Sequence, residues 1–258
     1  MRVNRRWLTR SCLAAGLLAA PRLNTAAEAD PNPTVHLGFE DGATTGWRTS
    51  KLAQPYSGTV VSEPVRSGKY AMRFELRAGD SPGGDGIRAE LKEQHLVPLR
   101  REIWYSFSTF IPASFPRWKD NSVISQWKGS TDEGEYDDRS PILAHRYWDH
   151  ALVIDIRHSS TPLQQGNDGE RSTLLRIPNF PRGVWHDFRY RIVWAHDEGE
   201  IDCWLNGKQV IRYRGPAGYN DTRGPYFKLG LYHHNGGNEP FVIYHDEYKR
   251  GFRREDVD

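Results

Sequence analysis

The sequence is poor in sulfur, and this argues against both a disulfide framework and a cysteine-based zinc site. The 258-residue chain has 2 Cys and 2 Met. Cys12 lies in an N-terminal segment that resembles a cleaved leader, which would leave Cys203 alone in the mature chain. Neither a disulfide framework nor a cysteine-based zinc site can then form within one chain. Cys203 lies in the strand-like run Ile201–Leu205, where we expect it to be a small buried hydrophobe.

The sequence also lacks helical periodicity and a marked excess of charge. No stretch shows a sustained apolar repeat of 3.6 residues, which argues against a mainly helical fold. Lys and Arg number 35 and Asp and Glu 33, for a net charge of +2. This balance argues against a general nucleic-acid binder. It leaves room for a local basic groove that suits an anionic ligand.

The N-terminus has the features of an export signal. Several arginines precede the short apolar run Leu13–Ala20, and Ala27–Ala29 has the form of a cleavage site. The apolar run is too short to span a bilayer. We therefore predict a signal peptide over residues 1–29 and a secreted or periplasmic protein. Asn4–Leu8 suggests twin-arginine export, although a chance arginine pair explains it equally well, and an uncleaved amphipathic helix is the remaining alternative.

The rest of the chain is patterned for β-structure. Tyr70–Arg77 and Phe188–Trp194 alternate apolar and charged residues with a period of two, which predicts strands with one buried face. Asn206–Gly207 between two apolar runs predicts a tight hairpin. Short strands, frequent turn residues and nine Trp for a core predict one all-β domain over residues 30–258. We expect a β-jelly roll, a concanavalin A-like sandwich of two antiparallel sheets, with Ser159–Ser172 as a long loop bordering a cleft.

The first chemistry-bearing segment is Gly83–Lys92. On a strand, Arg88, Glu90 and Lys92 share one face. An arginine can bind a carboxylate through two parallel hydrogen bonds, and we expect Glu90 to hold the Arg88 guanidinium in place. An ordinary surface ion pair of little energetic value is the alternative explanation.

The second segment is Val123–Gly129, in which Gln126 and Lys128 share a face and Trp127 points the other way. An amide beside an ammonium can receive a substrate carboxylate. Taken alone, this pattern also fits a strand with a polar solvated side.

The third segment is Gly224–His234. Tyr226, Lys228, Gly230 and Tyr232 line one face of the predicted strand. A glycine inside a strand indicates that something approaches the backbone closely, and we expect that to be a sugar ring. A tyrosine-bearing strand on a solvated face is the alternative.

These segments, in the order R-x-E, Q-x-basic and Y-F-K-x-G-x-Y, resemble the three strands that mark jelly-roll polysaccharide lyases. The chain resembles the heparin lyase I-like and glucuronan lyase-like group most, and jelly-roll alginate lyases in pattern. Further likeness lies in Ser67–Phe74, Trp104–Phe107, Gly183–Phe188, Trp204–Lys208 and Gly218–Asp221. The resemblance covers nearly the whole mature chain. It implies an enzyme that cleaves a uronate-containing acidic polysaccharide by β-elimination.

The resemblance also implies residue roles. The tyrosine that ends the third strand acts as the acid and often also as the base in this family, and corresponds to Tyr232. The family's lysine four residues earlier corresponds to Lys228, its first-strand arginine to Arg88 and its second-strand glutamine to Gln126.

One position departs from the family. Relatives often carry a histidine where this sequence has Lys128, and His145 is the candidate replacement for that histidine as a base. We expect the substrate to contact Lys128, Glu90, Tyr226, His233 and Asn235.

The implied chemistry is removal of the C5 proton of a uronate and expulsion of the sugar bound through O4. Donors aimed at the developing charge are usually the largest catalytic contribution, and Arg88, Gln126 and Lys128 are the candidates. A tyrosine is a poor base at neutral pH, but a nearby cation favours the phenolate. No cofactor is required. Relatives bind a structural calcium ion, for which Asp246 and Glu247 are the candidate ligands here.

Two other classes of function remain open from the sequence. A glycoside hydrolase needs two carboxylates flanking the bond, and no E-x-D-x-E strand is present. A non-catalytic carbohydrate-binding module would not need Tyr232 and Lys228 to face Arg88 and Gln126. We therefore expect a monomeric enzyme whose partner is an acidic polysaccharide, with no nucleic-acid partner and no membrane contact after signal removal. The absence of a dense basic cluster favours a glucuronan-like or alginate-like polymer over heparin.

Overall fold

The computed structural model describes residues 34–80, 86–120, 122–136, 138–166, 169–233 and 239–258. The predicted signal peptide, Cys12 and Asn235 lie outside the described residues. The described chain consists of strands and one short 3-10 helix, η1 (Arg254–Val257). No helix in these ranges is long and apolar enough to cross a membrane.

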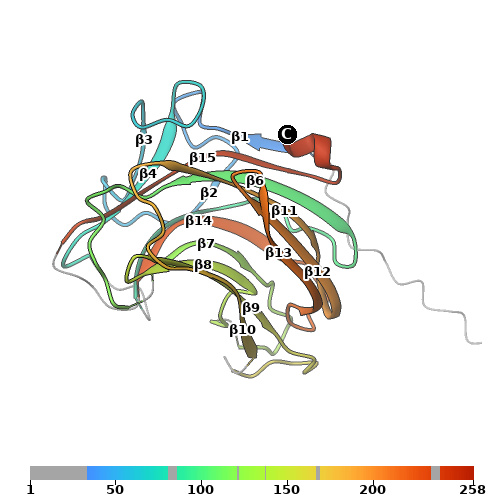
Figure 1. Cartoon of the computed structure of the whole chain (residues 1–258). Coiled ribbons are helices and arrows are strands. Elements are labelled where there is room, and N and C mark those ends of the chain that lie inside the picture. Colours follow the sequence, from blue (N-terminus) through green and yellow to red (C-terminus); the bar gives the residue numbers. More distant parts are fainter. Residues whose placement is uncertain (1–33, 81–85, 121, 137, 167–168, 234–238) are drawn as a thin grey trace, which may run out of the picture.

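The strands form two sheets in which neighbouring strands are antiparallel (Figure 1). In spatial order, the first sheet contains β13 (Lys208–Ala217), β12 (Ala195–Leu205), β11 (Trp185–Val193), β6 (Glu102–Phe110), β15 (Phe241–Gly251), β4 (Ala71–Leu76) and β3 (Gly58–Val61), with β1 (Val35–Leu37) also paired to β15. The second sheet runs β10 (Glu170–Ile177), β9 (Ala151–His158), β8 (Leu143–Trp148), β7 (Ser122–Lys128), β14 (Tyr226–His233), β5 (Ile87–Lys92) and β2 (Arg48–Lys51).

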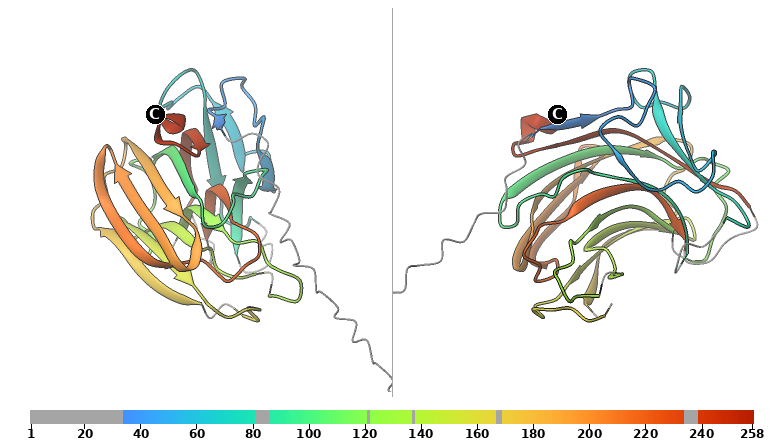
Figure 2. Two further views of the ribbon diagram at one scale, coloured as in Figure 1. Left: turned by 90° about the vertical axis from the view of Figure 1, so that its right-hand side faces the viewer. Right: turned by 180° about the vertical axis from the view of Figure 1, so that it is seen from behind.

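The sheets are stacked as two layers curved in the same sense, and the seven-stranded sheet lies on the inner side of the curve (Figures 1 and 2). Aromatic rings from both sheets fill the space between them. The ring centroids of Phe107 on β6 and Phe227 on β14 are 5.0 Å apart, and those of Trp127 on β7 and Phe227 are 4.8 Å apart. This arrangement confirms the predicted β-jelly roll, because two amphipathic sheets bury their apolar faces against each other.

Local predictions agree with this architecture. On β11, Phe188, Tyr190 and Ile192 are buried while the alternating residues are partly exposed. Asn206 and Gly207 join β12 to β13 with φ of 49° and 80°, the left-handed pair that a tight hairpin turn requires. Cys203 is fully buried, and burial raises the pKa of its thiol to about 12.

The loop prediction over Ser159–Ser172 is too long at its C-terminal end. β10 begins at Glu170 and pairs with β9, so that Glu170 to Ser172 belong to the sheet. These residues are polar and exposed because β10 is an edge strand, and their composition therefore resembles that of a loop.

A buried ion pair links the two sheets. Arg250 on β15 is fully buried, and its Nε donates to Glu93, which directly follows β5. Burial raises the pKa of the Glu93 carboxyl, and Arg250 opposes that shift. The backbone N–H of Glu93 also bonds to the carbonyl of Phe227 at 2.9 Å, which fixes the end of β5 against β14.

Candidate active site

The three chemistry-bearing segments become adjacent strands at the centre of the seven-stranded sheet. β14 lies between β7 and β5, and their polar side chains point away from the core into one hollow of about 270 Å³. The lining residues named from the sequence are Arg88, Gln126, Lys128, Tyr226, Lys228 and Tyr232. The fold therefore gathers residues that are more than a hundred positions apart in the chain.

Tyr232 and Arg88 are direct cross-strand neighbours in this hollow. They are paired in register on β14 and β5, and the guanidinium carbon of Arg88 lies 4.7 Å from the centre of the Tyr232 ring. A guanidinium over an aromatic face is held by the ring's quadrupole. Its positive charge also lies beside a phenol that must gain and lose a proton.

The prediction that Glu90 holds the Arg88 guanidinium is wrong. Its buried carboxylate instead accepts hydrogen bonds from Gln126 Nε2 and, at 2.6 Å, from Lys228 Nζ. The reason is register, because Lys228 is paired with Gln126 on one side while Gly230 is paired with Glu90 on the other. Glu90 thus orients Gln126 and Lys228, and not Arg88.

Lys128 and Tyr226 form the other end of the hollow, where they are paired in register on β7 and β14. The Lys128 ammonium donates to the backbone carbonyl of Arg139. The pKa of Lys128 is lowered to about 8, mainly by burial. The positive charges of Lys228, Arg139 and Arg88 lower it further. The ammonium is therefore charged at neutral pH and close to its titration range.

Gly230 is needed for a different reason from the one predicted. Its φ is +140°, and a Cβ there would lie 2.1 Å from the carbonyl oxygen of Ala89 on the neighbouring strand. The register of β14 against β7 also shifts between Leu229 and Tyr232. The backbone of β5 therefore approaches Gly230 too closely for any side chain, and this accounts for the glycine.

Two predicted histidines do not lie in the hollow. His145 on β8 is fully buried on the core side, where its Nε2 bonds to the hydroxyl of Tyr190. His233 is also fully buried, and its Nδ1 bonds to Ser122 Oγ at 2.8 Å. Burial lowers the pKa of each imidazole to about 3. Both residues alternate with hollow-facing neighbours, and for this reason they point inward.

The structure adds Arg146, which the sequence analysis did not single out. It lies on β8, is paired in register with Val123 of β7, and lines the hollow near Tyr232. Its Nε donates to Asp155 on β9 at 2.7 Å. The sequence signal was present, because Arg146 alternates with the core residues His145 and Tyr147, but the run Leu143–Trp148 is too apolar overall to show which face is inner.

The structure also adds the segment around Arg139, which borders the Lys128 end of the hollow. Arg139, almost fully buried, donates to both carboxylate oxygens of Asp221 at 2.8 and 3.0 Å and to Glu135 at 3.1 Å. Burial raises the pKa of Asp221 to about 6, although Arg139 opposes the shift. This network fixes the Arg139 carbonyl that receives Lys128. Asp221 ends the Gly218–Asp221 motif noted in the sequence, and that motif therefore serves to anchor the segment.

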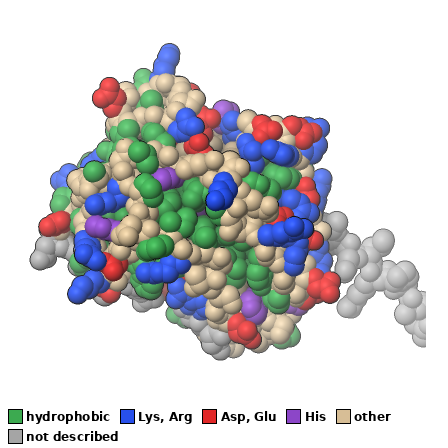
Figure 3. Space-filling view, in the orientation of Figure 1, with side chains coloured by type: hydrophobic (Ala, Val, Ile, Leu, Met, Phe, Trp, Pro, Cys, Tyr) green, Lys and Arg blue, Asp and Glu red, His purple; other side chains and the backbone are tan. Residues whose placement is uncertain are grey.

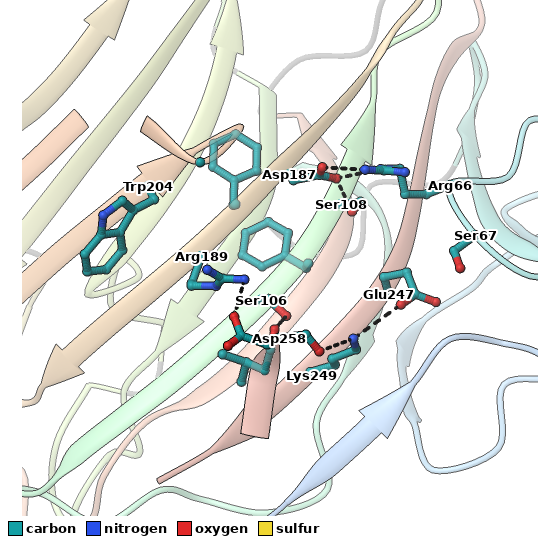
Figure 4. A pocket seen from close by; sticks show the side chains of 14 residues that line it. Arg66, Ser67, Ser106, Ser108, Asp187, Arg189, Trp204, Glu247, Lys249 and Asp258 are labelled. Atoms are coloured by element: carbon teal, nitrogen blue, oxygen red, sulfur yellow. Dashed lines mark hydrogen bonds and ion pairs between the residues drawn. The ribbon is translucent and has the colours of Figure 1, made fainter. Parts of the chain in front are cut away.

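A separate hollow, of about 330 Å³, lies on the outer side of the other sheet (Figure 4). Its charges occur in pairs: Arg66 bonds to Asp187 at 2.7 Å, and Arg189 bonds to Asp258 at 2.6 Å. Acidic and basic side chains are likewise intermixed around the molecular face shown in Figure 3. The site on the inner sheet differs in that cations there outnumber carboxylates.

The candidate calcium ligands do not fit that ion. Asp246 Oδ2 accepts the backbone N–H groups of Arg66 and Ser67, and its Oδ1 accepts that of Glu247. Both carboxylate oxygens thus face donors, whereas calcium requires oxygen ligands directed at the ion. Across the described residues, no group of three His, Cys, Asp or Glu side chains is placed to hold a metal ion.

Comparison with known proteins agrees with this geometry. Among solved structures, an endo-β-1,4-glucuronan lyase from the fungus Trichoderma reesei superposes with a TM-score of 0.71 at 20% identity, over 87% of this chain and 97% of that one. An alginate lyase from a Chlorella virus gives 0.56 at 12% identity, over 83% of this chain and 96% of that one. A β-glucanase catalytic domain of glycoside hydrolase family 131 from Podospora anserina gives 0.55 at 12% identity, over 86% and 94%.

At these identities the structural likeness shows the fold alone, and it includes a hydrolase as well as lyases. No match was found among the curated proteins. The family model named Polysaccharide lyase matches residues 39–249, which is most of the chain and includes the whole hollow. The chain belongs to this polysaccharide lyase family, and its fold is that of the jelly-roll lyases.

Proposed function

We propose that this lyase cleaves a uronate-containing polysaccharide by β-elimination at the hollow on the inner sheet, with Tyr232 as acid and base. The observation that carries the proposal is the cross-strand pair of Tyr232 and Arg88 in one hollow with Gln126. A glycoside hydrolase would need two carboxylates there. Among the described residues that line the hollow, only Asp138 carries a carboxylate, and the nearby Glu90 and Asp155 are already bonded to Lys228 and Arg146.

Elimination requires that the C6 carboxylate be neutralised, because the C5 proton is only weakly acidic while the carboxylate is anionic. Arg88 and Gln126 are the donors we assign to this carboxylate. The bond between Glu90 and Gln126 fixes the amide, so that its remaining N–H can be aimed at the substrate. A donor that is already oriented costs no reorganisation when charge develops.

The proton steps follow from the position of Tyr232. Its phenolate removes the C5 proton, the C4–C5 double bond forms, and the resulting phenol returns the proton to O4 of the departing sugar. Arg88 favours the phenolate because its positive charge lies beside the ring. Lys128 occupies the family's histidine position, and here it binds the anionic chain as a cation at the far end of the hollow.

The charge distribution supports an acidic polymer with one carboxylate per sugar. Around the hollow, Arg88, Lys128, Arg146 and Lys228 face only a few carboxylates. A glucuronan-like or alginate-like polymer fits this separated set of cations. The lyases named above act on glucuronan and on alginate.

Two further proposals concern the setting of the enzyme. We propose that residues 1–29 direct export, so that the mature protein meets its polymer outside the cytoplasm. We also propose that it acts as a monomer.

The test is to incubate the purified protein with glucuronan, alginate, heparin and hyaluronan and to follow the ultraviolet absorbance of the unsaturated uronate product. The proposal predicts a rise on at least one polymer, glucuronan or alginate before the others. Reducing ends released with no rise in absorbance would indicate hydrolysis and refute it.

A further inference from the structure

A row of side chains continues from Tyr232 across the inner sheet, beyond the hollow. Tyr232 on β14 is paired with Val123 on β7, Val123 with Arg146 on β8, and both Arg146 and Arg176 with Val153 on β9. Cross-strand partners share a face of the sheet. Arg146 on β8 and Arg176 on β10 therefore lie on the same solvent-facing side as Tyr232.

An aromatic ring belongs to the same area. Trp148 follows Arg146 by two positions on β8, which places it on the same face, and it is only partly buried. The guanidinium carbon of Arg176 lies 5.8 Å from the centre of the Trp148 ring. Arg176 is exposed, and no ion pair involving it occurs within the described residues.

Arg146 lies between the hollow and the pair of Trp148 and Arg176, and an ion pair holds its side chain in place. Its Nε bonds to Asp155, which also receives Arg171 from β10 at 2.5 Å. Asp155 is fully buried, and one carboxylate thus orients two guanidinium groups on neighbouring strands. Because neighbouring strands are about 4.8 Å apart and β9 lies between β8 and β10, Arg146 and Arg176 are roughly 10 Å apart across the sheet, which is on the order of two sugar residues along a chain.

We propose that Arg146, Trp148 and Arg176 form a further subsite for the polyuronate, which fixes the direction of the bound chain from β5 across to β10. The proposal rests on the proposed function of the hollow. Trp148 supplies an apolar face for a pyranose ring, and Arg176 binds the carboxylate of that sugar. Arg146 lies between this sugar and the one cleaved at Tyr232.

Arg176 is exposed at an edge strand, where a single charge contributes little to folding. The outer sheet offers a matched control in Arg212 on β13, which is likewise exposed on a strand near the edge of its sheet.

The experiment compares Arg176→Ala and Trp148→Ala with Arg212→Ala in initial-rate assays on the polymer that the wild-type protein cleaves. We expect KM to rise about tenfold in Arg176→Ala, the factor for one lost charge-assisted contact, and by a similar factor in Trp148→Ala, which loses the apolar face for the sugar ring, with kcat little changed in both. In the Tyr232→Phe background, both substitutions should weaken binding of long oligouronates and leave that of the shortest ones unaltered.

KM values equal to that of Arg212→Ala in both variants would overturn the subsite while leaving the proposed function standing. Circular dichroism of Trp148→Ala verifies its folding, and Arg176→Ala decides the case if that variant is misfolded. No unsaturated product from the wild-type protein on any polyuronate would overturn both the function and the subsite.

Discussion

Arg88 and Tyr232 face each other across β5 and β14, with the guanidinium carbon 4.7 Å from the ring centre. The unbroken antiparallel ladder of β14 and β5, from Lys228 to His233, sets this relation. The chain thus places a fixed cation beside its candidate acid and base by means of backbone geometry.

Replacement of Arg88 should reduce turnover more than binding. We expect Arg88→Ala to lower kcat about a hundredfold, the loss typical of one donor that stabilises developing charge. Arg88→Lys should recover only part of this, because an ammonium lacks the planar fork that binds a carboxylate. Steady-state kinetics of both variants check the prediction, and a change confined to KM would contradict the role.

Glu90 and Lys228 should behave as one unit. Lys228 Nζ lies 2.6 Å from Glu90 Oε2, and both side chains are almost fully buried. We expect Glu90→Gln and Lys228→Gln each to lower the unfolding free energy by about 3 kcal/mol, because each leaves a buried charge without its partner. The double variant should lose less than the sum of the two. Denaturant unfolding measures this coupling, and strictly additive losses would show that the pair is not coupled.

The pH dependence of binding should follow Lys128. Burial lowers the pKa of Lys128 to about 8, so its positive charge is present at pH 7 and is lost as pH rises through that value. We therefore expect KM for the anionic polymer to rise above about pH 8. Lys128→Arg keeps its charge over this range and should remove the rise. An identical rise of KM in that variant would assign the titration to another group.

The buried pair between the sheets gives a prediction for stability alone. Glu93→Ala leaves the fully buried Arg250 without its ion-pair partner, and we expect a loss of about 4 kcal/mol in unfolding free energy. The surface pair of Arg100 and Asp197 is the control, because both side chains are about half exposed. Asp197→Ala should leave stability unchanged within error. Equal losses in the two variants would contradict the importance we give to burial.

The sequence was sufficient for the fold and for most of the hollow. Period-two alternation identified the strands, and it placed Tyr226, Lys228 and Tyr232 on one face of β14. The same rule would have excluded His233, which follows Tyr232 directly and must point the other way. For this residue, position on the strand decides more than residue type.

The remaining features depend on contacts between segments that are far apart in the chain. The run around His145 is apolar on both sides, so its inner face is set only by packing between Phe107 and Phe188. The partner of Glu90 is set by the register of β5, β14 and β7, which alternation within a single strand does not specify. Arg139 is positioned by Asp221, which lies 82 residues away in sequence.

The most direct test of the account is a single substitution, Tyr232→Phe, in the polymer assay that detects unsaturated uronate. The hydroxyl is lost while the ring beneath Arg88 is kept, so polymer binding should remain close to that of the wild-type protein. We predict that formation of unsaturated product falls at least about a thousandfold, because both proton steps lose their carrier. Product formation at a rate near that of the wild-type protein would contradict the assignment of Tyr232 as acid and base.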